Sequence, residues 1–168
     1  EGTLLVPNPV SAAVVADEYL SPRDRDGHGT HTAATAGGNA NVEALIQGRS
    51  LGRVSGMAPR ARIAAYKVCW NGTGCFFSDS VAAVDAATRD GVDVINYSIG
   101  GGSPDDPASL LETAFMSAAT AGIFIAGAAG NEGPGTATVD KNSPWVTTVA
   151  ASTIHRFVLD EEQPVRAL

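Results

Sequence analysis

The sequence lacks several features that mark large classes of protein. None of its apolar stretches approaches the roughly 18 residues that a membrane-spanning helix requires, so we expect no membrane partner. It has fewer basic than acidic residues, 11 against 18, and the basic ones are scattered singly or in short pairs. Nucleic acid is therefore excluded as a partner, because phosphate backbones are bound by basic patches or stripes.

The chain also has little cysteine and no recognisable secretion signal. Residues 1–5 do not form a charged segment followed by a long apolar run, as a signal peptide would. The two cysteines, Cys69 and Cys75, are six positions apart. This separation is compatible with a small disulfide loop or with two buried free thiols, and so few cysteines say little about the redox compartment.

Glycine, by contrast, is abundant and separates the apolar runs from one another. The 19 glycines often lie at the ends of these runs, which is typical of tight turns between strands and helices. Small residues predict a short helix over 29–36, followed by a glycine-containing loop over 41–59. An apolar run then predicts a strand over 61–68, and a turn follows at 71–74.

Strands and helices alternate in the second half of the chain. Apolar residues at helical spacing predict one helix from Ser78, its cap, to Gly91, and another from Asp106, its cap, to Gly122. Apolar runs predict three strands, at 92–98, 123–129 and 145–151. This order predicts an α/β fold, in which a parallel sheet has helices on both faces and its strands are buried on both faces.

The first segment whose residues could carry out catalysis or binding surrounds His28. This histidine lies between two glycines at the start of the first predicted helix, so its imidazole is approachable. The string is compatible with a catalytic base or with a turn that only hydrogen-bonds locally. A metal site is a third possibility, and its ligands would be Asp24, Asp26, His28 and His31. The glycines favour a turn over converging ligands, so we predict no metal site.

Two further strings lie at the carboxyl ends of predicted strands, where open α/β sheets collect their sites. Asn131 follows the strand at 123–129, where its amide would donate to an oxyanion or simply tolerate the left-handed backbone of a turn. Residues 98–101, Ser-Ile-Gly-Gly, leave backbone groups free for an extended peptide. Residues 72–74, Gly-Thr-Gly, either do the same or form an ordinary turn.

Together these strings resemble the motifs of subtilisin-like serine proteases, and they are most similar to the plant-type branch and its bacterial relatives. The resemblance covers most of the chain, from Ser21 to Thr153. It is carried by the strings 21–33 with His-Gly-Thr-His, 56–61, 66–68, 128–133 with Gly-Asn-Glu-Gly, and 142–146. It implies a subtilisin-like α/β fold and a secreted or extracellular serine endopeptidase that acts on proteins or peptides. We expect no cofactor.

The resemblance also implies roles for individual residues. His28 would be the general base and Asn131 the side-chain donor of the oxyanion hole, while His31 would be structural. Cys69 and Cys75 match a cysteine pair of the same branch, which implies a disulfide. The substrate-binding residues would be Ser98, Ile99, Gly100, Gly101, Ala129 and Gly130 around the residue before the cleaved bond, with Gly72, Thr73 and Gly74 in a second strand.

Two members of the family's Asp-His-Ser triad are absent from the sequence. No Asp-Ser-Gly or Asp-Thr-Gly precedes His28, and Gly-Thr-Ser does not occur. We therefore expect an incomplete fold, with the central part of a peptidase domain at 1–154 and a tail or the start of an inserted domain at 155–168. These 168 residues alone should be inactive, because a general base needs a nucleophile to deprotonate.

Two other interpretations remain for the chain. A non-catalytic module of the same fold would bind peptides without cleaving them, and flanking sequence without the triad's aspartate and serine would favour it. A doubly wound nucleotide-binding domain would need a Gly-x-Gly-x-x-Gly turn or a phosphate loop, and the sequence has neither.

Overall fold

The computed structural model divides the chain into two compact units. It describes residues 21–71, 73–101, 106–152, 159–160 and 163–164. The first unit comprises residues 63–150 with the stretch before residue 33, and the second comprises residues 33–62 with those from 151 onward. In the part of the chain that is described, no helix is both long and apolar enough to span a membrane.

The centre of the first unit is a parallel sheet of three strands in the order β5-β6-β7. The strands are β5 (Val94–Tyr97), β6 (Phe124–Ala128) and β7 (Thr147–Val149). Helix α4 (Leu110–Thr120) connects β5 to β6 and so completes a βαβ unit. The α/β architecture with a parallel sheet, predicted from the alternating patterns, is confirmed.

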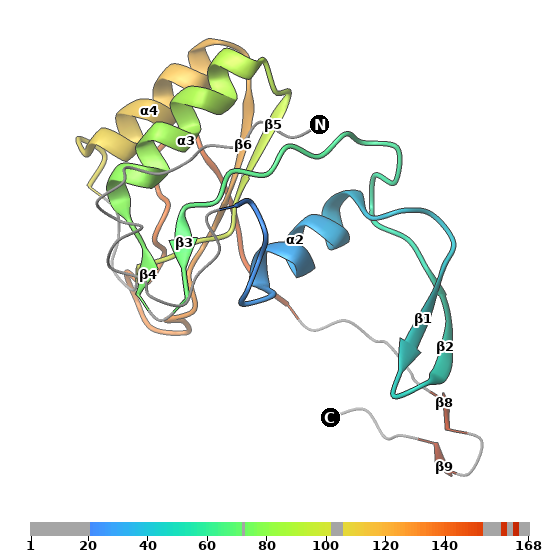
Figure 1. Cartoon of the computed structure of the whole chain (residues 1–168). Helices are drawn as coiled ribbons and strands as arrows, with labels where there is room; N and C mark the ends of the chain where they lie inside the picture. Colours follow the sequence, from blue (N-terminus) through green and yellow to red (C-terminus); the bar gives the residue numbers. More distant parts are fainter. Residues whose placement is uncertain (1–20, 72, 102–105, 153–158, 161–162, 165–168) are drawn as a thin grey trace. The chain divides into compact units, whose positions relative to one another are not determined.

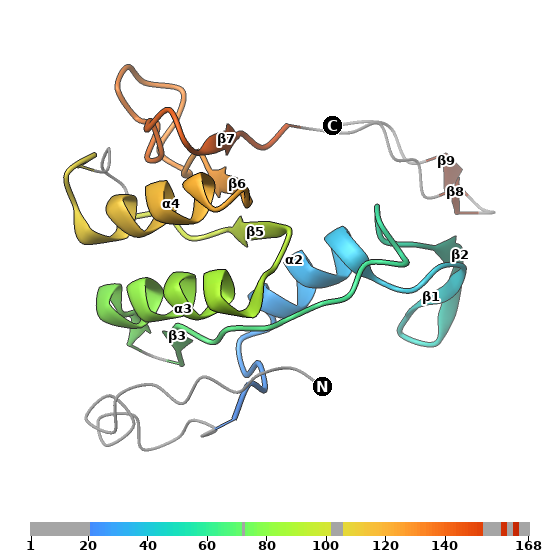
Figure 2. The ribbon, with the colours of Figure 1, turned by 90° about the horizontal axis from the view of Figure 1, so that it is seen from above.

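The core of this unit lies on one face of the sheet, where helix α3 (Phe77–Asp90) lies beside α4 (Figure 1 and Figure 2). The core residues are Val84, Leu111, Ala114, Phe115, Ala118, Ile123, Ile125 and Val146. Phe115 is fully buried, edge-on to Tyr97 with ring centroids 5.2 Å apart.

The opposite face of the sheet is open within the described residues. Val94 and Phe124 are register partners on that face, and they are 57% and 52% exposed. The prediction that the strands are buried on both faces is therefore wrong for the part of the chain that is described. The reason is that α3 and α4 pack together and contribute to the same core, on the side of Ile95 and Ile125.

Helices α3 and α4 start at residues other than those predicted. Helix α3 begins one residue before Ser78 and has no side-chain cap, so Ser78 does not cap it. Helix α4 is capped by the Ser109 hydroxyl, whereas Asp106 accepts the Ala108 N–H in a preceding turn. The end of α3 agrees with the prediction, because Gly91 takes the left-handed conformation with φ 72° that closes a helix.

The strand predicted at 61–68 is wrong, and a short hairpin follows it instead. Residues 61–65 are exposed and pair with no described strand, so an apolar run here does not become part of a ladder. The hairpin consists of β3 (Cys69–Trp70) and β4 (Gly74–Cys75), which pair antiparallel around the predicted turn.

Helix α2 (His28–Gly37) confirms the short helix predicted there, and its second half, from Ala33, belongs to the second unit. This unit also contains an antiparallel hairpin of β1 (Val42–Ile46) and β2 (Arg49–Val54). The loop predicted at 41–59 is therefore wrong. Gln47 and Gly48 join the two strands with φ values of 50° and 82°, as in the two-residue turns that suit hairpins.

Two short strands lie near the end of the chain, β8 (Leu159–Asp160) and β9 (Gln163–Pro164), and they pair antiparallel. The predicted domain boundary between residues 154 and 155 lies outside the described residues.

Candidate functional site

His28 is the first residue of α2, and Asp24 organises the loop before it. Oδ1 of Asp24 accepts the N–H groups of Asp26 and Gly27 at 3.0 and 2.9 Å. Oδ2 accepts the N–H and the hydroxyl of Thr30 at 2.7 and 2.8 Å. These hydrogen bonds, the one from Gly27 first, lower the pKa of Asp24 from 3.8 to about 2. Asp24 is therefore an anion at the N-terminus of the helix, where negative charge is stabilising.

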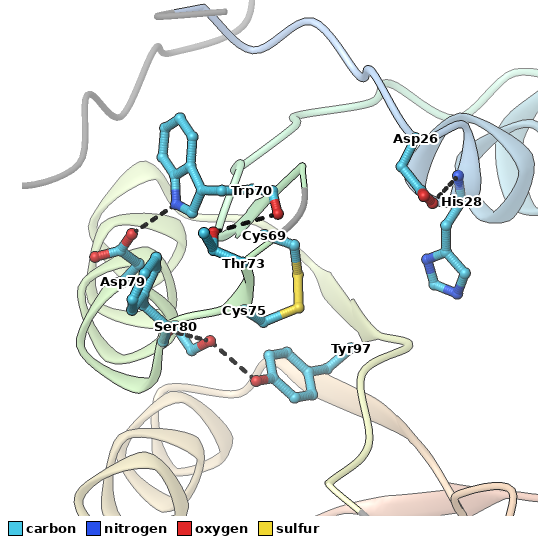
Figure 3. The surroundings of a disulfide bond; sticks show 10 residues. Asp26, His28, Cys69, Trp70, Thr73, Cys75, Asp79, Ser80 and Tyr97 are labelled. Atoms are coloured by element: carbon cyan, nitrogen blue, oxygen red, sulfur yellow. Dashed lines mark hydrogen bonds between the residues drawn. A yellow bond between two sulfur atoms is a disulfide. The ribbon is translucent and has the colours of Figure 1, made fainter. Parts of the chain in front are cut away.

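The imidazole of His28 is exposed, and it makes no hydrogen bond to any described residue. Only its backbone N–H is bonded, to Oδ2 of Asp26 at 3.3 Å, and the ring points away from that carboxylate (Figure 3). Because Asp24 and Asp26 use their oxygens on backbone N–H groups, they do not converge with His28 on a common point. Among the residues that are described, no cluster of His, Cys, Asp and Glu could hold a metal ion.

The glycine-rich segments after β5 and β6 lie next to each other. A Cβ added to Gly100 would lie 3.4 Å from the Cα of Gly130. One side of Gly101 is open, since a Cβ added there would meet no atom within 4 Å. Asn131 follows Gly130 directly, is exposed, and hydrogen-bonds through its side chain to no described residue. The structure thus brings residues 98–101 and 129–131 together at the carboxyl ends of two paired strands.

The hairpin of β3 and β4 is closed by a disulfide between Cys69 and Cys75 (Figure 3). It is attached to α3 through Trp70, whose buried indole N–H donates to Oδ2 of Asp79 at 3.0 Å. The disulfide and the indole hydrogen bond both constrain the short turn at residues 71–74, which contains the predicted second substrate-binding segment.

Thr73 and Gly74 lie in the exposed tip of this hairpin, and Gly72 lies outside the described residues. The Thr73 N–H donates to the carbonyl of Trp70 at 3.2 Å. A Cβ added to Gly74 would meet no atom within 4 Å, so one side of the tip is open.

Lys67 connects this hairpin to the loop before His28. Its ammonium group donates to the carbonyl of Arg23 at 2.7 Å and lies 5.1 Å from the ring centroid of Trp70. No hydrogen bond joins His28 to Asn131. The predicted site residues therefore form two groups, one around the hairpin and the His28 loop and the other at the strand ends.

Two buried charged residues near the strand ends were not predicted from the sequence. Asp140 is 0% exposed and Lys141 is 2% exposed. The Asp140 N–H donates to the carbonyl of Ala129 at 3.0 Å, and its Oδ2 accepts the Gly101 N–H at 3.1 Å. The signal in the sequence is faint, because two adjacent charges before an apolar run usually lie on the surface.

Comparison with known proteins agrees with the fold and the motifs. The Subtilase family matches residues 10–161. Subtilisin-like protease SBT1.6 of Arabidopsis thaliana is 56% identical over 142 residues, and Subtilisin-like protease SBT1.3 of the same plant is 51% identical over 139. Each match covers 83% of this chain but only 19% and 18% of the relative, so the chain spans about a fifth of the length of these curated relatives.

Solved structures give the same assignment. S41 Psychrophilic Protease and Sphericase each match with a TM-score of 0.56, at 33% and 32% sequence identity. Each match covers 76% of this chain and 39% of the solved chain. The family match, these relatives and the parallel sheet agree, and the chain belongs to the subtilase family.

Proposed function

We propose that this chain is part of a secreted serine endopeptidase, in which His28 is the general base and Asn131 donates a hydrogen bond to the oxyanion. The observation that carries the proposal is the pairing of β5 with β6, which brings the glycine-rich residues 98–101 and 129–130 together just before Asn131. An extended peptide that bonds to this open backbone would present its carbonyl near the Asn131 amide.

The proposed reaction is acyl transfer. A serine oxygen attacks the peptide carbonyl, His28 takes the serine proton and then gives it to the leaving amine, and the Asn131 amide stabilises the oxyanion. The exposed, unbonded imidazole of His28 supports this role, since a base must reach both the nucleophile and the leaving group. The serine and the aspartate of the triad would come from the rest of the protein, so the 168 residues alone would not hydrolyse peptides.

The substrate would be a protein or peptide in extended conformation. The residues proposed to surround the side chain before the cleaved bond are Ser98, Ile99, Gly100, Gly101, Ala129 and Gly130, and those of a second backbone contact are Gly72, Thr73 and Gly74. The open space beside Gly74 and Gly101 supports both contacts. The disulfide between Cys69 and Cys75 supports secretion, because disulfides persist in oxidising compartments.

The experiment is the hydrolysis of a fluorogenic peptide by the full-length protein and by two histidine variants. We expect His28→Ala to lower kcat by at least about 10⁴-fold, as loss of a general base does in enzymes of this mechanism. His31→Ala is the matched control, because His31 lies on the same helix and should leave kcat within about tenfold. Equal loss in both variants would contradict the role of His28.

A second candidate is a peptide-binding module without catalysis. The open, glycine-rich backbone at residues 98–101 and 129–130 would bind an extended peptide in such a module as well. The two candidates differ in the flanking sequence, which would supply both motifs for the peptidase and neither for the binding module. They also differ in turnover, because the module would bind peptides but leave them intact.

A further inference from the structure

The carboxylate of Asp140 is completely buried, yet it is only partly hydrogen-bonded. Asp140 is 0% exposed, and its Oδ2 accepts the Gly101 N–H at 3.1 Å. Its Oδ1 has no hydrogen-bond partner among the described residues. An incompletely bonded carboxylate is costly to bury, so such an atom points to a role beyond packing.

This carboxylate lies between the two segments that the proposed function places around the substrate. A Cβ added to Gly100 would overlap Oδ2 of Asp140, and one added to Gly130 would lie 2.9 Å from its Cγ. The Asp140 N–H is bonded to Ala129 in the same segment as Gly130. A negative charge is therefore in contact with both backbone walls of the proposed peptide site.

The neighbouring positive charge lies further back along the strands. The stem of Lys141 packs against Gly127, and its ammonium group is 5.5 Å from the ring centroid of Tyr97. Tyr97 and Gly127 are register partners on neighbouring strands. Each lies three residues before a glycine that contacts Asp140, Gly100 in the first case and Gly130 in the second. Glu132, two residues after Gly130, is exposed and also acidic. The strand ends are thus more negative than the interior of the sheet.

We propose that Asp140 is a specificity-determining residue, whose charge makes the site favour a cationic side chain over an anionic one at the substrate residue before the cleaved bond. The inference rests on the proposed function. For an assumed separation of about 6 Å between the carboxylate and the substrate charge, and an effective dielectric constant near 20, the interaction is strong enough to change a rate constant roughly a hundredfold. The carboxylate therefore acts through the glycine walls without a direct contact, and screening still leaves at least about a tenfold preference.

A purely structural role for Asp140 makes a different prediction. Through its N–H and Oδ2, Asp140 connects Ala129 to Gly101, and such a connection would affect all peptides equally. Asn at this position keeps a side-chain oxygen that accepts the Gly101 N–H, while it removes the charge. The variant Asp140→Asn therefore separates the charge from the connection.

The test uses three peptides that differ only in having Lys, Gln or Glu before the cleaved bond, and it measures kcat/KM with the full-length protein. We expect the order Lys, Gln, Glu, with a ratio between Lys and Glu of at least about tenfold. In Asp140→Asn the ratio of kcat/KM between the Lys and Glu peptides should fall towards one, whatever the change in the absolute rate on the Gln peptide.

Glu112→Gln is the matched control, because it removes another completely buried carboxylate. Glu112 is 0% exposed and also has one unpartnered oxygen, but its other oxygen accepts the Trp145 indole N–H at 3.0 Å on the core side of α4. This variant should keep the preference for Lys over Glu, whatever its effect on stability.

Equal cleavage of the Lys and Glu peptides by the unaltered protein would overturn the inference, even if Asp140→Asn failed to fold. An unchanged ratio in a folded Asp140→Asn would overturn it too. If the full-length protein cleaves the Gln peptide and its His28→Ala variant does not, the proposed function stands in either case. If none of the three peptides were cleaved, the proposed function would fail, and this inference with it.

Discussion

The loop before α2 should depend on the charge of Asp24, and Asp24→Asn tests this dependence. The carboxylate accepts hydrogen bonds from the N–H groups of Asp26, Gly27 and Thr30 and from the Thr30 hydroxyl. An asparagine has one acceptor oxygen in place of two, so the variant leaves part of this set unbonded. Its effect should therefore concentrate on the residues that begin the helix and carry His28.

The magnitude follows from the pKa of Asp24, which falls from 3.8 to about 2. A difference of nearly two units corresponds to an upper limit of about 2.5 kcal/mol, since each unit is worth about 1.4 kcal/mol. Asp24 is exposed, so solvent screening reduces this to about 1 kcal/mol, similar to the value of a helix cap. Because the folded-state pKa is depressed, the stabilisation is complete above pH 3.8 and is lost as the pH falls towards 2.

Amide hydrogen exchange over residues 26–32 of the full-length protein is the assay. A loss of about 1 kcal/mol should make these amides exchange about fivefold faster in Asp24→Asn at pH 7. The ratio between variant and original protein should shrink towards one near pH 2. Asp26→Asn is the control, since that carboxylate is bonded only to the His28 N–H at 3.3 Å. Equal exchange at pH 7, or a ratio independent of pH, would refute the reasoning.

Three further substitutions test the core and the site. Phe115→Ala should lower the free energy of unfolding by about 3–5 kcal/mol in thermal denaturation, whereas Met116→Ala, 43% exposed in the same helix, should cost much less. Asn131→Ala should lower kcat about 100- to 1,000-fold with little change in KM, a magnitude measured in subtilisin itself, and unchanged turnover would contradict its role. Gly130→Ala should destabilise by about 2–4 kcal/mol, because φ is 92° and the new Cβ meets Asp140.

The order of strands and helices around the sheet was predictable because apolar spacing reports burial directly. Phe115 and Ile125 are apolar because they face the same core, and this local pattern is visible without the fold. The helix starts were less predictable, since Asp106 and Ser109 are both suitable caps, and it is the Ser109 hydroxyl that accepts the Glu112 N–H. When two residues are equally suited to cap a helix, contacts with the rest of the fold decide between them, and these contacts cannot be read from the sequence.

The hairpin of β1 and β2 was missed for a different reason. Its strands are almost entirely exposed, so no alternation between buried and exposed residues marks them. The turn is formed by Gln47 and Gly48, both at positive φ, and glutamine is an uncommon residue in that conformation. A hairpin that packs few side chains is specified mainly by its turn. This turn has the glycine of the usual Asn-Gly pair but a glutamine in place of the asparagine.

The glycines at the strand ends illustrate what sequence reasoning leaves undetermined at the site. Gly100 and Gly130 both read as turn residues, and Gly130 does have positive φ. Gly100 has a different reason to lack a side chain, because the carboxylate of Asp140 occupies the place of its Cβ. The three residues meet only after β5 has paired with β6, so the motif strings identify the glycines but not the charge that they accommodate. That charge lies outside the strings that gave the family, so the resemblance that identifies the glycines could not have pointed to Asp140.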